Sequence, residues 1–187
     1  SLETAKQVNN VLKKKYQTLL SEPNDNLVKN IKKFKPNIIF NALHGRFGED
    51  GYVQLILENE GIKYTHSGVK ASSICINKLI TKNIFKKHKI LTPKYLILRE
   101  NTKEKYKKIY KQVVRYLNFP VVIKPVNEGS SVGVFICNKN NFYKNLDKLK
   151  NEREILIEKY IPGREIQVAI MGNRKLGTIE LVPKRKF

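Results

Sequence analysis

The stretch from residue 119 to residue 133, FPVVIKPVNEGSSVG, constrains the fold most, because it joins a buried strand to a loop of small residues. The β-branched run 121–123 lies between two prolines and predicts a strand with both faces covered. Lys124 ends that run, so its stem can pack while its ammonium reaches an anion. The loop 129–133 then supplies exposed amide donors and two hydroxyls, which suit phosphate oxygens. Taken alone, the loop also fits an ordinary turn between two strands.

Composition bounds the class of protein. A chain of 187 residues with 41% hydrophobic content suits one large domain or two small ones. No run is long and apolar enough to span a membrane, and no signal-peptide pattern opens the chain. The two cysteines, Cys75 and Cys137, lie far apart in apolar settings, which disfavours a disulfide framework or a zinc site. We therefore expect a cytoplasmic protein without a membrane partner.

The net charge of +21 and the pI near 9.9 raise the question of nucleic-acid binding. The lysines are scattered over every segment, however, and the aromatic residues are not interleaved with them as a base-stacking surface requires. Such a surface would bind polyanions weakly and in a salt-dependent way whatever the function. We expect no specific nucleic-acid partner, and a non-enzymatic basic nucleic-acid-binding protein remains an alternative.

The first seventy residues have the pattern of an α/β unit. Apolar residues at helical spacing predict a helix over the first twenty residues, with Ser1 near its cap. A buried strand over 37–43, a helix over 54–60 and a strand over 62–65 then predict an open parallel sheet. Ligands bind beyond the carboxyl ends of such strands, and the charged side chains of that end are His44, Arg46, Glu49 and Asp50.

A second region begins near residue 73 and has a different pattern. Its predicted helices cover 73–88, 103–117 and 141–149. Its predicted strands cover 95–98, 121–124, 134–137, 155–160, 165–171 and 176–182, with a hairpin turn at 172–174. Several strands joined by turns, with helices between some of them, predict an α+β lobe with a largely antiparallel sheet.

Three segments in this order resemble the D-alanine–D-alanine ligases of the ATP-grasp superfamily: NALHGRFGEDG at 41–51, the stretch 119–133, and LIEKYIPGREIQV at 156–168. The shorter pieces at 1–2, 64–68 and 77–79 fit the same family. The resemblance implies an N-terminal Rossmann-like (pre-ATP-grasp) α/β domain with a parallel sheet over residues 1–72. It implies an ATP-grasp domain, an α+β nucleotide-binding lobe with a largely antiparallel sheet, over residues 73–187.

The family resemblance also implies a reaction. ATP phosphorylates the carboxylate of one D-alanine, and the amine of a second D-alanine attacks the acylphosphate, which yields the dipeptide for peptidoglycan synthesis. The implied cofactors are ATP and Mg²⁺ or Mn²⁺, and complete members of the family are expected to be homodimers. A related ATP-grasp ligase with another acceptor, such as D-lactate, is the alternative within the same fold.

Residue by residue, the resemblance assigns roles to thirteen positions. The ATP-binding positions that it implies are Lys78, Lys124, Glu128, Ser131, Val132, Glu158, Lys159, Tyr160, Ile161 and Glu165. The substrate-binding positions are His44 and Glu49, and Ser130 belongs to the catalytic network around the second D-alanine. Several of these positions also fit a role without function: Lys78 as a surface lysine, Glu158 and Glu165 as solvent-facing charges on strands, and His44 as a structural histidine.

Other features of the family have no counterpart here. The acidic residue that precedes Ser1-Leu2 in the family is absent from the sequence. The family's loop tyrosine, the phosphate-stabilising arginine and the Asp/Glu/Asn metal ligands are all expected beyond Phe187. No metal ligand is therefore assigned within this chain. The resemblance predicts an internal part of a longer protein, incomplete in both domains and inactive alone.

Overall fold

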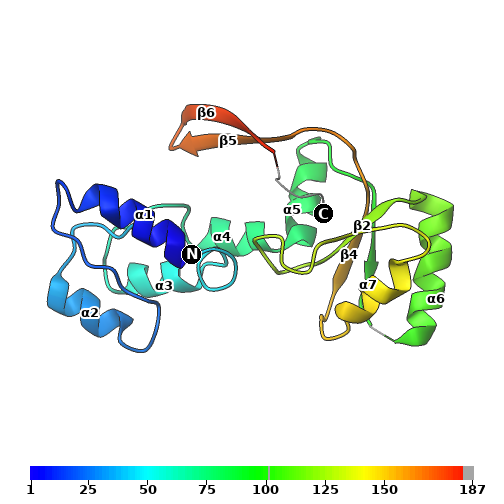
Figure 1. Cartoon of the computed structure of the whole chain (residues 1–187), viewed down its shortest axis with the longest axis horizontal. Helices are drawn as coiled ribbons and strands as arrows, with labels where there is room; N and C mark the ends of the chain where they lie inside the picture. The colour runs from blue at the N-terminus through cyan, green and yellow to red at the C-terminus, as the bar shows by residue number, and fades with distance from the viewer. Residues whose placement is uncertain (101, 183–187) are drawn as a thin grey trace. The chain divides into compact units, whose positions relative to one another are not determined.

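The computed structural model describes residues 1–100 and 102–182, which form two compact units (Figure 1). The first unit contains residues 1–92 and 125–133, and the second contains residues 93–124 and the described residues from 134 onward. The chain therefore passes between the units after Thr92, Lys124 and Gly133. The domain boundary that the resemblance places at residue 72/73 stays a prediction.

Helices make up most of the regular structure of the first unit. They are α1 (Leu2–Leu12), α2 (Leu27–Phe34), α3 (Tyr52–Asn59), α4 (Val69–Ile76) and α5 (Lys78–Lys87). The predicted first helix is real but shorter than twenty residues, and it buries no side chain. Sequence analysis missed α2, whose C-cap residue Lys35 has a left-handed conformation (φ 52°) just before Pro36.

The predicted parallel pairing in the first unit is present at one position. Ile39 and Tyr64 form a parallel bridge, in which the Ile39 amide donates to the Lys63 carbonyl at 2.8 Å and the Thr65 amide donates to the Ile39 carbonyl at 2.9 Å. Beside this bridge, Ile31, Val53 and Leu57 form a small buried cluster.

The described residues do not extend this bridge into the strands predicted over 37–43 and 62–65. The reason is local competition for backbone donors. The Asn41 amide donates to the Thr65 hydroxyl at 3.0 Å, and the Leu43 amide donates to the Asn41 side chain at 3.1 Å. Side chains thus satisfy groups that a strand ladder would otherwise use.

The single helix predicted over 73–88 is two helices, α4 and α5, which meet at Asn77. The Asn77 backbone is extended (ψ 100°), and its side-chain oxygen accepts hydrogen bonds from the Leu79 and Ile80 amides at 3.1 and 3.0 Å. An asparagine N-cap satisfies amides that have no partner within the helix. The cap therefore starts α5 at Lys78.

The second unit holds a four-stranded sheet with the order β1-β4-β2-β3. Its strands are β1 (Tyr95–Leu98), β2 (Val121–Pro125), β3 (Phe135–Cys137) and β4 (Ile155–Lys159), and its helices are α6 (Lys103–Gln112), a π-helix (Val113–Leu117) and α7 (Phe142–Lys148). The β1–β4 and β2–β3 pairs are antiparallel. The predicted antiparallel character of this lobe is confirmed for these pairs.

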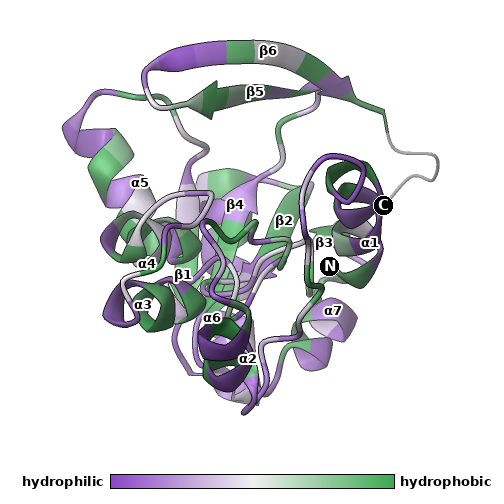
Figure 2. Cartoon of the chain, turned by 90° about the vertical axis from the view of Figure 1, so that its left-hand side faces the viewer, coloured by the Kyte–Doolittle hydropathy of each residue, from purple (hydrophilic) through white to green (hydrophobic). Residues whose placement is uncertain are grey.

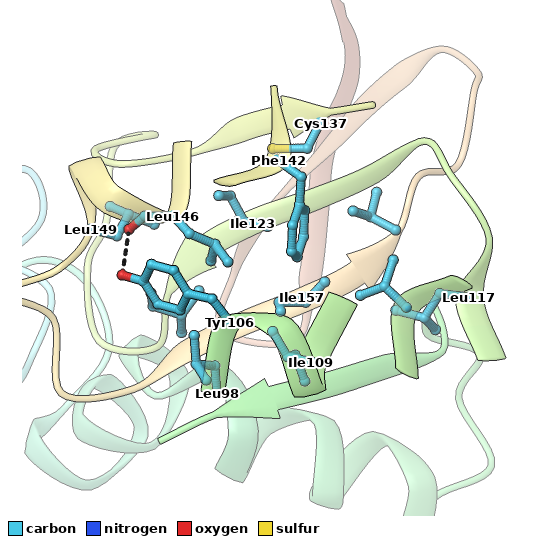
Figure 3. Close-up of a cluster of buried hydrophobic side chains, with 13 residues drawn as sticks. Leu98, Tyr106, Ile109, Leu117, Ile123, Cys137, Phe142, Leu146, Leu149 and Ile157 are labelled. Carbon is cyan, nitrogen blue, oxygen red and sulfur yellow. Dashed lines mark hydrogen bonds between the residues drawn. The ribbon is translucent and has the colours of Figure 1, made fainter. Parts of the chain in front are cut away.

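One hydrophobic core joins this sheet to α6 and α7 (Figure 3). Ile123, Phe142 and Ile157 are fully buried in it, and burial of one such side chain contributes about 1.5–3 kcal/mol. The Tyr106 hydroxyl reaches the edge of the core and donates to the Leu146 carbonyl at 3.3 Å (Figure 3). Cys137 is a free thiol in this core, and burial raises its pKa.

The remaining strands, β5 (Glu165–Met171) and β6 (Arg174–Leu181), form an antiparallel hairpin. Met171 pairs with Arg174, so a two-residue turn that begins at Gly172 (φ +57°) connects the strands. Both strands carry hydrophobic segments (Figure 2), yet every one of their residues is exposed. No helix in the part of the chain that the structure describes is both long and apolar enough to cross a membrane.

Candidate functional site

In the first unit, the turn that follows His44 is held together by its own carboxylates. Glu49 Oε2 accepts a hydrogen bond from the Gly45 amide at 2.8 Å, and the Glu49 amide donates to the Gly45 carbonyl at 2.8 Å. Asp50 accepts from the Phe47 and Tyr52 amides at 2.8 and 3.0 Å. Both acidic residues thus hold backbone amides and still present carboxylate oxygens at the surface.

His44 lies between this turn and the start of α1. Its Nε2 is 3.1 Å from the Thr4 hydroxyl, its backbone amide donates to the Ser1 hydroxyl at 2.9 Å, and its Nδ1 is 3.9 Å from Glu49 Oε1. Sequence analysis placed Ser1 near the start of the first helix, and Ser1 is indeed its N-cap residue. Its hydroxyl makes no cap hydrogen bond, however, and accepts from the His44 amide instead. Sequence analysis did not predict the contact of Thr4 with His44. A threonine in the first turn of an amphipathic helix does not indicate a partner forty residues away in the sequence.

Lys78, at the first position of α5, holds the segment that leads into the Gly/Ser loop. Its backbone amide donates to the Val126 carbonyl at 3.1 Å. Its ammonium donates to the same carbonyl at 3.4 Å and also to the Glu128 carbonyl. The Lys78 charge is therefore fixed at the base of the loop.

The Gly/Ser loop itself has an unusual backbone. Ser130 (φ 49°), Ser131 (φ 59°) and Gly133 (φ 68°) are all left-handed, and the Val132 amide closes a turn on the Gly129 carbonyl at 3.0 Å. A left-handed conformation costs a non-glycine residue about 1–2 kcal/mol. Strained backbone of this kind clusters at ligand-binding sites, and the side chains of both serines are exposed.

The turn after His44 and the Gly/Ser loop touch within the first unit. A Cβ atom placed on Gly129 would lie 2.9 Å from Glu49 Oε2 and 2.9 Å from the Gly45 Cα. The first unit therefore brings together His44, Glu49, Glu128 and the loop that carries Ser130.

In the second unit, Lys124 of β2 and Glu158 of β4 form an ion pair on neighbouring strands. The Glu158 side chain is only 8% exposed and that of Lys124 is 23% exposed. Glu158 is thus a buried carboxylate, not a solvent-facing strand charge. Glu165, by contrast, is exposed at the start of β5.

The segment after Glu158 is fixed by its backbone. The Lys159 amide donates to the Lys94 carbonyl at 2.9 Å, and the Tyr160 amide donates to the Pro120 carbonyl at 3.2 Å. The Lys159 ammonium donates to the Asn118 carbonyl at 3.3 Å. Ile161, which follows, is 62% exposed and presents an apolar side chain to solvent.

No group of three or more His, Cys, Asp or Glu side chains within residues 1–100 and 102–182 could hold a metal ion. The first unit offers three chemical features, namely the fixed Lys78 ammonium, a strained hydroxyl-rich loop, and carboxylates beside a histidine. Such a set suits a phosphate-bearing ligand and a small zwitterion, since a zwitterion needs both signs of charge nearby.

Comparison with known proteins identifies the family. The family model described as the D-ala D-ala ligase C-terminus matches residues 84–187. The D-alanine–D-alanine ligase of Pelagibacter ubique is 61% identical over the whole chain, and that of Wolbachia pipientis wMel is 42% identical over 92% of it.

Solved structures show the same likeness. The D-alanine–D-alanine ligase of Bacillus anthracis matches 95% of the chain with a TM-score of 0.75 and 32% identity, and its complex with ATP matches 99% with a TM-score of 0.75 and 30% identity. The chain has the ATP-grasp fold of these ligases, with antiparallel sheets. It spans 61% and 53% of the two curated relatives and 59% and 63% of the two solved chains.

Proposed function

We propose, from the premise that this chain belongs to the D-alanine–D-alanine ligase family, that it serves ATP-dependent ligation of two D-alanines for peptidoglycan synthesis. The ion pair between Lys124 and Glu158 carries the proposal, because it fixes an ammonium and a carboxylate at the ends of two adjacent strands. Fixed charge costs no reorganisation when phosphate oxygens arrive.

The proposed nucleotide contacts fall into two sets. In the first unit, Lys78 binds phosphate oxygens, while Glu128 and the amides of Ser131 and Val132 shape the loop that follows; in the second unit, Lys124 binds phosphate oxygens. In the second set, Glu158, Lys159, Tyr160 and Ile161 surround the adenine, and Glu165 accepts hydrogen bonds from the ribose hydroxyls. A carboxylate suits paired hydroxyls because each of its oxygens is an acceptor.

We propose that His44 and Glu49 hold the first D-alanine and that Ser130 orients groups around the second. Once the first carboxylate is phosphorylated, the amine of the second substrate attacks it and phosphate leaves. These residues contribute position and charge without forming a covalent bond to substrate. Magnesium or manganese would offset phosphate charge in such a transfer, and no group of three or more metal-binding side chains lies within residues 1–100 and 102–182.

Further proposals follow from the family premise. They are a Rossmann-like architecture with a parallel sheet for residues 1–72, an ATP-grasp domain for residues 73–187, a homodimeric assembly and a cytoplasmic location. A D-lactate acceptor in place of the second D-alanine remains the alternative to be tested beside the main reaction.

Because the curated relatives are longer, the activity test uses a hybrid in which the chain is continued with the remaining sequence of the Pelagibacter relative. Phosphate release is measured with ATP and D-alanine, and separately with ATP, D-alanine and D-lactate. The proposal expects release that depends on D-alanine, and Ser130→Ala should lower this turnover more than it lowers ATP affinity. If the hybrid protein binds ATP but releases no phosphate when D-alanine is added, the proposed reaction is wrong.

A further inference from the structure

Two motifs that are far apart in the sequence touch at a pair of glycines. A Cβ atom on Gly129 would meet the Gly45 Cα and Glu49 Oε2, each at 2.9 Å, and the Gly45 amide nitrogen at 3.5 Å. Real Cβ atoms essentially never approach other atoms within 3.0 Å. The close approach of the two backbones is therefore possible only because residue 129 has no side chain.

On one side of this contact lies the turn that follows His44. Glu49 uses Oε2 to accept from the Gly45 amide at 2.8 Å, and its other oxygen lies 3.9 Å from His44 Nδ1. The Glu49 carboxylate therefore cannot move without disturbing either the turn or the histidine beside it.

On the other side lies the segment that Lys78 holds. The Lys78 ammonium donates to the carbonyl of Glu128, the residue directly before Gly129, and to the carbonyl of Val126. A phosphate that binds the Lys78 ammonium would compete with these carbonyls for the same charge and so pull on the segment that they belong to. Because packed groups transmit displacement with little compression, the change would reach Glu49 through Gly129.

We propose that Gly129 is a positioning residue that couples the first D-alanine position to the ATP phosphate position. The inference rests on the proposed function for the identity of the two ligands. The contact joins residues of this chain alone, so it can be tested without either ligand.

The first experiment measures amide hydrogen exchange by NMR in the 187-residue chain with Lys78→Met. Loss of the ammonium should speed amide exchange at residues 128–132. If the contact couples the two segments, exchange at Gly45 and Glu49 should also become about tenfold faster, which corresponds to ~1.4 kcal/mol in the free energy of local opening. The Thr65 amide, bonded to Ile39 in the same unit, reports general loosening and should change less. Lys70→Met, at an exposed position of α4, is the matched control. Faster exchange confined to residues 128–132 would overturn the coupling.

The second experiment compares Gly129→Ala with Gly177→Ala, a site where an added Cβ meets nothing within 4 Å. Calorimetry gives ATP affinity with and without D-alanine. In the unaltered chain each ligand should change the affinity of the other by the same factor, and Gly129→Ala should bring that factor close to one while Gly177→Ala leaves it unchanged. A factor that survives in Gly129→Ala, or a factor of one in the unaltered chain, contradicts the proposal. Absence of any ATP binding by the unaltered chain would instead count against the proposed function, and the exchange experiment would still decide the coupling.

Discussion

Glu158 is held by Lys124 from the neighbouring strand, so a nearly buried carboxylate and a partly buried ammonium stabilise each other within the sheet. The pair has two consequences that can be separated by experiment. One is for the stability of the second unit, and the other is for nucleotide binding.

For stability, Lys124→Met should lower the free energy of unfolding, because it leaves the Glu158 carboxylate without its ammonium. A loss of about 1–3 kcal/mol is expected for a partly exposed pair. Lys124→Met combined with Glu158→Gln should recover part of that loss, since the uncompensated charge is gone. Urea unfolding of the two single variants and the double variant gives the coupling energy, and strictly additive losses would mean that the two groups do not interact.

For nucleotide binding, Lys124→Ala should weaken ATP affinity by about 1.5–3 kcal/mol, the range for a charge-assisted hydrogen bond. Lys139→Ala, at an exposed position after β3, removes the same charge and is the control. Isothermal calorimetry measures both variants. If both variants lose the same amount of ATP affinity, the loss comes from the lower net charge, and Lys124 does not contact the nucleotide.

Tyr64 should make stability depend on alkaline pH. Burial, with a further effect from its 2.6 Å hydrogen bond to Glu58, raises the Tyr64 pKa from its usual value of 10.0 to about 12. Because the folded-state pKa is the higher one, the stabilising contribution is complete below about pH 10 and is lost as pH rises toward about 12. Urea unfolding across that range should show a smaller decline for Tyr64→Phe than for the unaltered chain, and identical declines would contradict the prediction.

The left-handed backbone at Ser131 (φ 59°) should tolerate glycine better than a β-branched residue. Ser131→Val should lower the free energy of unfolding by about 1–2 kcal/mol, whereas Ser131→Gly should change it by less than about 1 kcal/mol. Val132→Thr, next in the loop and without positive φ, supplies a β-branched control. Thermal unfolding decides between these expectations, and a Val variant as stable as the Gly variant would mean that the loop is not strained.

Asn77 should contribute more to stability than Asn26, although both are N-cap residues. The Asn77 side chain accepts two amide hydrogen bonds at the start of α5, while Asn26 makes no side-chain cap bond. Asn77→Ala should therefore cost about 1 kcal/mol, and Asn26→Ala should cost clearly less. Chemical denaturation of the two variants makes the comparison, and equal costs would remove the cap as the cause.

Elements with strong patterns were predictable from the sequence. The run of β-branched residues at 121–123 and the apolar strand 155–159 were found because buried strands need such residues whatever surrounds them. The failures arose where side chains serve as backbone partners. Asn77 divides a helix that looks continuous, and the Asn41 side chain takes the Leu43 amide that a longer strand would pair.

For the candidate site, too, the sequence predicted the separate segments but not the contacts between them. Sequence motifs pointed to His44, Glu49 and the Gly/Ser loop as separate segments, and their proposed roles stay predictions. Periodicity could not reveal that Gly129 rests on Glu49, or that Thr4 and Ser1 hold His44, because these contacts join residues about forty to eighty positions apart. The burial of Glu158 was equally hidden, since its strand does not alternate cleanly between polar and apolar residues.

The strand order β1-β4-β2-β3 also matters for how the chain is made. β4 is the last of these four strands to leave the ribosome, yet it lies between β1 and β2. The earlier strands therefore emerge without the neighbour that joins them, and their apolar faces stay open until residues 155–159 arrive. Sheets assembled from such distant segments fold slowly and are prone to aggregate while incomplete. A ribosome stalled before β4 would thus display a nascent chain that depends on chaperones, and one stalled well after it would not.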